Sequence, residues 1–277
     1  MKITIVTPSF NQRSFIEEAL WSVKNQGDPS VEHIVMDGAS TDGTVEVLRD
    51  YSARPGWEHL RWFSQPDKGQ SDALNQGFRM AQGDLIGWLN SDDRYRAGCF
   101  GAVTAAFGEH ASADLLYGDY TLIDAAGRYL QIRREIEFNL FILLYHKVLY
   151  IPSTATFFRR SILDAGVLLD DAFQYAMDYE FFMRLAHLGY RFQHIPDLLA
   201  DFRWHQDSKT MKASHLQAKE QDSVVEAYSR ILRALPGGLA RRAVLMALRR
   251  AAGMRRYSEK ALRGYYFQQF RPNLQRL

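Results

Sequence analysis

Two adjacent carboxylates, Asp92 and Asp93, are the residues of this chain that are best placed to do chemistry. They follow the apolar run 85–89, which is typical of a buried strand, and open α/β sheets bind ligands beyond the carboxyl ends of their strands. A pair of carboxylates there suits a hard divalent cation, which in turn suits a diphosphate. The alternative is a solvated Ser-Asp-Asp turn ahead of a helix.

Polar segments follow three further expected strands, and apolar residues at helical spacing lie between the strands. Ser14 with Glu17 predicts a capping box for the first helix, and Thr41 with Asp42 predicts the cap of the second. This alternation predicts an α/β fold in which a largely parallel sheet has helices on both faces. The polar segments would then meet at one edge of the sheet, which favours a nucleotide site. The strands expected are 3–7, 31–36, 60–63 and 85–89, the third helix is 71–81, and the polar segments are 7–11, 37–40, 67–72 and 92–93.

The pattern changes after Gly98 and ends in a basic, helical tail. Twelve Lys and Arg residues lie between Arg230 and the C-terminus, against Glu259 alone, although the net charge of the chain is only +2. Val244, Ala247, Leu248 and Ala251 define an amphipathic helix in this tail. The further elements expected are a hairpin of 115–122 and 128–132, helices at 160–165 and 178–188, short strands at 192–195 and 198–204, and helix from 213 onward with a break at 236–238.

Composition is that of a globular protein, with 47% hydrophobic and 24% charged residues. A single cysteine, Cys99, excludes a disulfide framework and a zinc site built on several cysteines. The N-terminal residues lack a hydrophobic signal region, and the apolar stretch 138–151 is too short and too polar to span a bilayer. We therefore expect a cytoplasmic protein, with peripheral attachment to the inner face of the plasma membrane as an open alternative.

Six motifs in order resemble those of family 2 glycosyltransferases: TIVTPSFNQ, HIVMDGASTDGT, PDKGQSDALNQGF, GWLNSDDRY, PSTATFFRRSIL and MDYEFFMRLAHLG. The resemblance covers about residues 1–207 and implies the GT-A fold, a Rossmann-like, mixed and mostly parallel sheet flanked by helices. It implies a catalytic domain over 1–207, with a nucleotide-sugar half at 1–95 and an acceptor half at 96–207. Residues 208–277 would be a basic helical extension.

The resemblance also implies residues that bind the nucleotide-sugar donor. Three of them have a plainer alternative: Asp37 as a turn residue, Asp72 as a first-turn helix charge, and Lys68 as a solvated cation. The donor-binding residues it implies are Thr7, Pro8, Ser9, Asn11, Asp37, Lys68, Asp72, Asn90, Ser91 and Asp92.

For catalysis, the resemblance implies that Asp93 and His205 hold Mn²⁺ or Mg²⁺ on the donor diphosphate and that Asp178 is the general base. One displacement assisted by that base would invert the anomeric configuration. The alternatives are an N-cap role for Asp178 and a surface role for His205. Glu180 is the second candidate for the base.

The activity implied is inverting transfer from a nucleotide-sugar, with a UDP-sugar favoured, to a hydroxyl of a glycan or lipid-linked acceptor in bacterial cell-surface polysaccharide or glycolipid synthesis. The alternatives are a non-catalytic nucleotide-sugar-binding or scaffold protein and a nucleotidyltransferase, although the latter would favour a glycine-rich phosphate loop. Residues 138–151 would be core or part of the acceptor surface. The tail would pack on the catalytic domain or bind an anionic membrane; we expect no nucleic-acid partner, and a homodimer is plausible.

Overall fold

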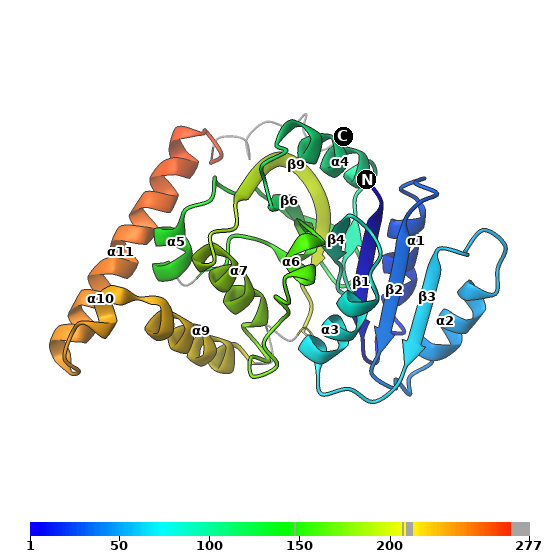
Figure 1. Ribbon diagram of the computed structural model, residues 1–277, viewed down its shortest axis with the longest axis horizontal. Coiled ribbons are helices and arrows are strands. Elements are labelled where there is room, and N and C mark those ends of the chain that lie inside the picture. Colours follow the sequence, from blue (N-terminus) through cyan, green and yellow to red (C-terminus); the bar gives the residue numbers. More distant parts are fainter. Residues whose placement is uncertain (147, 207, 209–212, 267–277) are drawn as a thin grey trace.

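A single mixed sheet forms the centre of the molecule in the computed structural model, which describes residues 1–146, 148–206, 208 and 213–266 (Figure 1). Its strands are β1 Ile3–Ser9, β2 Glu32–Asp37, β3 Leu60–Ser64, β4 Leu85–Trp88, β5 Arg94–Tyr95, β6 Leu115–Ile123, β7 Tyr129–Arg133, β8 Thr156–Arg159 and β9 Phe192–Arg203. The helices are α1 Ile16–Lys24, α2 Thr44–Ser52, α3 Gln70–Met80, α4 Cys99–Glu109, α5 Leu140–Tyr145, the 3-10 turn η1 Ser153–Ala155, α6 Ser161–Asp164, α7 Met177–His187, α9 Ser214–Tyr228, α10 Arg230–Arg233 and α11 Leu239–Leu262.

The order of strands across the sheet is β3-β2-β1-β4-β8-β6-β9-β5, and β7 pairs with β6. Strands β3, β2, β1 and β4 are parallel, and Ser9, Asp37 and Ser64 are register partners at their carboxyl ends. Strand β8 is antiparallel to both of its neighbours, whereas β6 and β9 are parallel to each other. The register therefore brings the polar segments after β1, β2 and β3 to one edge of the sheet, where open α/β sheets bind ligands.

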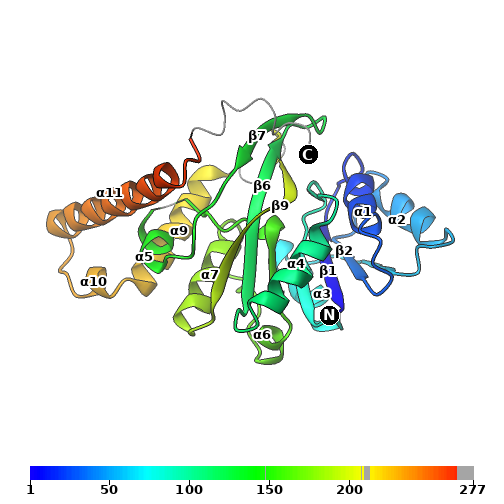
Figure 2. The same ribbon diagram turned by 90° about the horizontal axis from the view of Figure 1, so that it is seen from above.

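Alternate residues of the central strands face opposite sides, because side chains alternate along a strand. Val6 and Ile86 belong to a cluster with residues of α3, α5 and α7, whereas Ile5 and Leu85 belong to a cluster with residues of α1 and α4. A third cluster joins α1 to α2. Helices thus cover both faces of the sheet, as the strand–helix alternation predicts (Figure 1, Figure 2).

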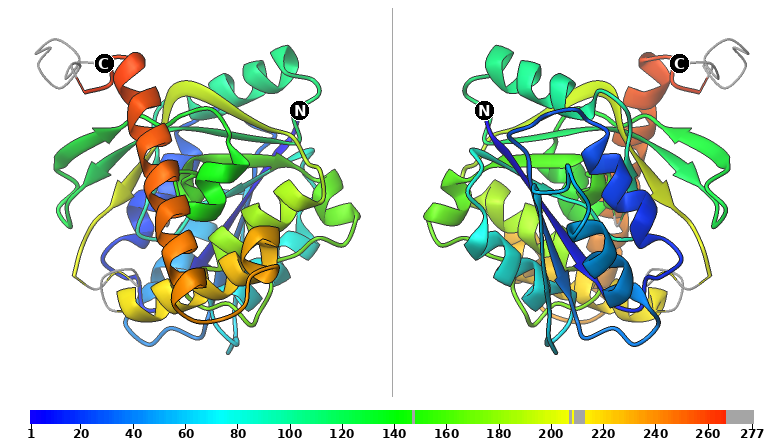
Figure 3. Two further views of the ribbon diagram at one scale, coloured as in Figure 1. Left: turned by 90° about the vertical axis from the view of Figure 1, so that its left-hand side faces the viewer. Right: turned by 90° about the vertical axis from the view of Figure 1, so that its right-hand side faces the viewer.

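The C-terminal helices pack against the same core as the helices of the sheet domain. Val224 and Val225 of α9, Leu232 of α10 and Ala252 of α11 are buried together with residues of α5 and α7. Helix α11 lies along one side of the molecule and contacts α5 (Figure 3). Within the described residues, no helix has the length and apolar character needed to cross a membrane.

Three local expectations are wrong. The N-cap of α2 is Gly43, not Thr41 or Asp42, although Asp42 Oδ1 accepts from Thr44 N at 3.0 Å. The capping box does not form: the N-cap of α1 is Phe15, and Glu17 instead accepts a hydrogen bond from Arg13 Nη1 at 2.7 Å. The two short strands at 192–195 and 198–204 are the single strand β9, whose register with β6 shifts on either side of Asp119. A bulge there accommodates Pro196, which has no N–H to donate to the ladder. Strand β8 and helix α4 are additions to the expected elements.

Candidate functional site

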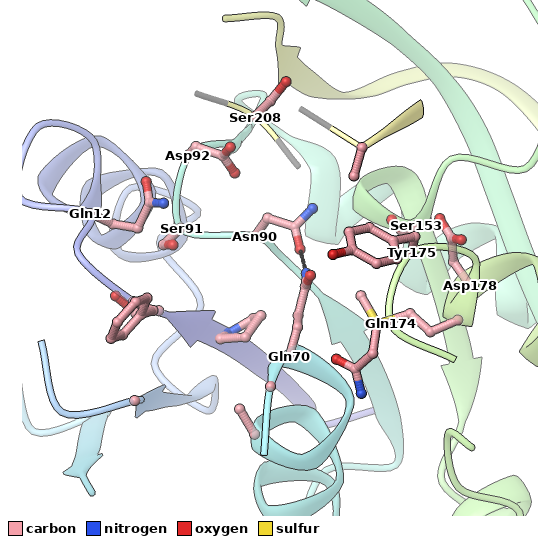
Figure 4. A pocket seen from close by; sticks show the side chains of 18 of the residues that line it. Gln12, Gln70, Asn90, Ser91, Asp92, Ser153, Gln174, Tyr175, Asp178 and Ser208 are labelled. Atoms are coloured by element: carbon pink, nitrogen blue, oxygen red, sulfur yellow. Dashed lines mark hydrogen bonds between the residues drawn. The ribbon is translucent and has the colours of Figure 1, made fainter. Parts of the chain in front are cut away.

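A cavity of about 880 Å³ opens at the carboxyl edge of the sheet (Figure 4). Its walls come from the ends of β1, β4 and β9, from the start of α3, and from the segments at the start of α7 and α9. Elements from both halves of the sheet domain and from the C-terminal helices therefore meet at this cavity. Six of the residues expected in the site line it: Pro8, Ser9, Asn90, Ser91, Asp92 and Asp178.

Asn90 is held in one orientation by three hydrogen bonds. Its Oδ1 accepts from Trp88 Nε1 and from Gln70 Nε2, both at 2.9 Å, and its Nδ2 donates to Asp93 Oδ2 at 3.1 Å. Because these bonds link β4 to the first residue of α3, Asn90 fixes the floor of the cavity in Figure 4.

Five other residues expected to bind the donor are absent from the cavity lining. Thr7 is buried and its Oγ1 lies 2.9 Å from His33 Nε2. Asp37 is also buried, and its Oδ2 accepts from Ser40 N at 2.9 Å and from Ser64 Oγ at 2.7 Å. The first contact links β1 to β2, and the second links the ends of β2 and β3. Contact between Asp37 and a nucleobase stays a prediction that nothing in this geometry tests.

The loops beside the cavity are held by hydrogen bonds from their backbone to the side chains of Asn11 and Asp72. The backbone N–H of Lys68 is one of the donors. Asn11 Oδ1 accepts from Thr41 N at 2.9 Å, which ties the loop after β1 to the loop after β2. Asp72 Oδ2 accepts from Lys68 N at 3.1 Å at the start of α3. Asp72 thus has the helix-start role that was the plainer alternative for it.

Asp93 is buried and does not face the cavity in which a donor would bind. It is 1% exposed, outside the cavity lining, and accepts hydrogen bonds from Thr154 Oγ1, Arg203 N and Asn90 Nδ2. Burial, together with the charge of Asp92, raises the pKa of Asp93 well above its usual range. Asp93 therefore ties β4 to β9 and to η1, and the carboxylate of the pair that faces the cavity is Asp92.

Asp92 and His205 form a pair at the edge of the cavity. Asp92 Oδ2 lies 3.0 Å from His205 Nε2, and the ring of His205 packs on Phe15 with ring centroids 4.8 Å apart. The contact is a hydrogen bond in this structure, and a carboxylate and an imidazole are both side chains that can bind a divalent cation. No group of three or more His, Cys, Asp or Glu side chains that could hold a metal occurs in the described part of the chain.

Asp178 lies in the first turn of α7 and points into the cavity from the side opposite Asp92 in Figure 4. The N-cap of α7 is Ala176, so Asp178 does not have the N-cap role that was its alternative. Glu180, the second candidate for the base, is buried and bound by Arg184 at 2.8 and 2.9 Å. Of the two carboxylates, Asp178 alone lines the cavity.

Glu220 of α9 binds the segment that leads into α7. Its carboxylate accepts from the backbone N–H groups of Gln174 at 3.1 Å, Tyr175 at 2.8 Å and Ala176 at 2.7 Å. These residues precede Met177, the first residue of α7, so the negative charge lies near the N-terminus of the helix, where the helix dipole favours it. A residue of the C-terminal extension thus fixes the segment that carries Asp178.

Several cavity residues have no signal in the sequence taken alone. Arg203 is fully buried at the end of β9, and its Nε donates to the backbone oxygen of Asp92 at 2.7 Å. Helix α9 reaches the cavity only because the chain folds back after β9, which no local pattern reveals. The further lining residues that were not singled out are Gln12, Ser153, Gln174, Tyr175, Ser208, His215, Leu216 and Gln217.

Comparison with known proteins agrees with this architecture. The sequence profile of Glycosyl transferase family 2 matches residues 4–166. An uncharacterised glycosyltransferase of Mycobacterium tuberculosis is 34% identical over 188 residues, which cover 66% of this chain and 68% of that protein.

Two solved structures share the fold. One is Staphylococcus aureus TarS residues 1–349 in complex with UDP-GlcNAc, with a TM-score of 0.64, 17% identity and coverage of 85% of this chain and 76% of that chain. The other is the mannosyltransferase PcManGT of Pyrobaculum calidifontis in complex with GDP-Man and Mn²⁺, with a TM-score of 0.62, 17% identity and coverage of 98% and 81%.

The mixed sheet shares the GT-A fold of these two structures, and the cavity lies at the carboxyl edge of the sheet. The chain belongs to glycosyl transferase family 2, as its six motifs predict.

Proposed function

We propose that this protein transfers a sugar, with inversion, from a nucleotide-sugar donor to a hydroxyl group of a glycan or lipid-linked acceptor of the bacterial cell surface. The observation that carries the proposal is one cavity with Asp92 at one wall and Asp178 at the other. The first carboxylate suits a donor diphosphate bound through a cation, and the second suits the acceptor. A UDP-sugar is the favoured donor, in keeping with the UDP-GlcNAc complex of TarS.

On the donor side, Asp92 and His205 would hold the divalent cation, whereas the sequence predicts Asp93 and His205 for this role. When bound, the cation neutralises charge on the leaving nucleoside diphosphate. The Mn²⁺ complex of PcManGT supports this cofactor. Asn90, Ser91 and the backbone of Pro8 and Ser9 would orient the donor, because they line the same wall.

On the acceptor side, Asp178 would take the proton of the attacking hydroxyl. The acceptor oxygen forms a bond to the anomeric carbon as the bond from that carbon to the diphosphate oxygen breaks, and the proton passes to a carboxylate oxygen of Asp178. Attack from the face opposite the leaving group inverts the configuration, and one base suffices for it. Arg203 and Glu220 would position the two carboxylates through the backbone.

A thermal-shift panel of nucleoside diphosphates with and without Mn²⁺ tests the donor site. We expect one nucleoside diphosphate to raise the melting temperature strongly only with Mn²⁺, because two protein side chains leave most cation positions to phosphate oxygens and water. Asp92→Asn should remove the Mn²⁺-dependent part of the shift. Asp50→Asn, at a side chain that is 62% exposed, is the control. If no nucleotide stabilises the folded protein, the donor site is wrong.

Replacement of Glu220 tests the link between the C-terminal helices and Asp178. Glu220→Gln leaves one carbonyl oxygen to accept from three N–H groups. We expect kcat to fall about tenfold, because poorer orientation of Asp178 raises the activation free energy by about 1.4 kcal/mol. Donor affinity should not change, because the donor-side wall is untouched. Glu226→Gln, on the same helix at a side chain that is 62% exposed, is the control. An unchanged kcat in a Glu220→Gln protein of lowered melting temperature would mean that Glu220 acts on stability alone.

A further inference from the structure

Helix α11 presents two different stripes to its surroundings. Residues that recur every three or four positions share one side of a helix. The inward stripe contains Leu245, Leu248, Ala252 and Arg256, which pack on the core or are buried. This stripe accounts for the attachment of the helix to the rest of the protein, so the opposite stripe is free for another role.

The outward stripe of α11 is apolar and exposed. Leu239, Met246, Met254 and Tyr257 are 84%, 54%, 65% and 53% exposed. Their spacing is completed by Ala243, Arg250 and Ala261, which are exposed as well. Tyr257 also packs against His146, with ring centroids 5.6 Å apart, and helix α11 is drawn in front of the other elements in the left view of Figure 3. Seven of the eighteen large hydrophobic side chains that are exposed in the described chain belong to residues 231–266: Ile231, Leu239, Met246, Met254, Tyr257, Leu262 and Tyr266.

The cations of this region divide into two sets. One set is turned toward the protein and paired with Glu226, Asp222, Glu135 and Glu137; it comprises Arg241, Arg249, Arg256, Lys260 and Arg263. The other set is exposed and has no ion pair within the described residues; it comprises Arg230, Arg233, Arg242, Arg250 and Arg255. The one acidic residue after Arg230, Glu259, pairs with Arg263 at 3.2 Å. Exposed positive charge therefore accompanies the exposed apolar stripe.

We propose that the outward face of α10 and α11 binds the surface of an anionic phospholipid bilayer. The apolar stripe would enter the boundary between headgroups and acyl chains, and Arg250 within the stripe and Arg242 beside it would reach the lipid phosphates. Charge complementarity favours this partner. Nucleic acid would use the arginines but leave Leu239, Met246 and Met254 without a role. The proposal goes beyond sugar transfer and does not depend on it.

Co-sedimentation of the full chain with vesicles tests the proposal. We expect binding to vesicles of phosphatidylcholine mixed with phosphatidylglycerol, and none to phosphatidylcholine alone. Binding should weaken as salt rises from about 0.1 M to about 0.5 M, because the charges are exposed. The double variant Arg242→Gln with Arg250→Gln should lower vesicle affinity about 25-fold, since each cation near the surface contributes about fivefold. Met246→Ser with Met254→Ser should lower it about tenfold or more.

Matched control variants distinguish binding through this surface from binding through exposed arginines or leucines elsewhere on the protein. The double variant Arg49→Gln with Arg79→Gln removes two exposed arginines elsewhere, and Leu188→Ser with Leu130→Ser removes two exposed leucines elsewhere. Both should bind vesicles as the parent protein does. Three outcomes would overturn the proposal. The first is an equal loss of binding in these controls, and the second is no binding to the mixed vesicles. The third is binding to duplex DNA that the methionine changes leave intact. Transfer to a soluble acceptor is unaffected by each outcome, so failure here leaves the enzymatic proposal standing.

Discussion

Asp178→Asn is expected to lower the rate of sugar transfer by about 10²–10⁴-fold while donor binding is retained, because a positioned general base contributes about that much. The amide has the shape of the carboxylate but cannot take the acceptor proton. Since Asp178 lies at the wall of the cavity opposite Asp92, its replacement leaves the donor side unchanged. The measurements are kcat from release of the nucleoside diphosphate and donor affinity from the thermal shift.

Glu180→Gln is the matched control for this prediction, because Glu180 lies on the same helix and was the second candidate for the base. Its carboxylate is buried against Arg184, so the variant should lose stability and keep the turnover of the folded fraction. Full turnover in Asp178→Asn together with loss of turnover in Glu180→Gln would transfer the role of base to Glu180. Nucleotide binding without turnover in the parent protein would favour the scaffold alternative instead.

Sequence patterns predict strands β1 to β4 and the helices between them well because these elements are defined locally. Runs such as 85–89 are buried on both faces and carry polar residues at their ends, so both the strand and its place at the sheet edge can be inferred. Strand β8 was not predicted, because its partners β4 and β6 lie far away in sequence. The bulge in β9 follows from pairing with β6, and a local pattern with Pro196 indicates a turn instead.

The site could be predicted as a set of segments but not in the role of each side chain. Asp92 and Asp93 are indistinguishable in sequence, and burial between β4, η1 and β9 separates them. Glu220 has no recognisable motif, because it binds the segment just before a helix that begins 43 residues earlier. Long-range hydrogen bonds of this kind decide which of two similar carboxylates faces a substrate, and single-sequence patterns contain no information about them.

Glu135→Gln should lower the free energy of unfolding by about 3 kcal/mol. This is the largest effect on stability that we expect for one substitution that keeps the shape of the side chain. Glu135 is 1% exposed, and its Oε2 accepts from Arg256 Nη2 at 2.7 Å and from Lys260 Nζ at 3.0 Å. Loss of the one negative charge leaves two cations of α11 buried side by side without compensation. Urea unfolding measures the loss.

The same change should loosen α11 before the sheet, because the ion cluster joins this helix to the segment before α5. Hydrogen exchange should therefore become faster over residues 239–262 and stay unchanged in β1 and β2. Glu46→Gln, at an exposed position of α2, should change stability by less than about 0.5 kcal/mol. Glu135→Met combined with Arg256→Met and Lys260→Met should recover most of the loss, because an apolar cluster replaces the buried charges. If the triple variant is no more stable than Glu135→Gln alone, uncompensated charge is not the cause, and the shape of the cluster is what attaches α11 to the catalytic core.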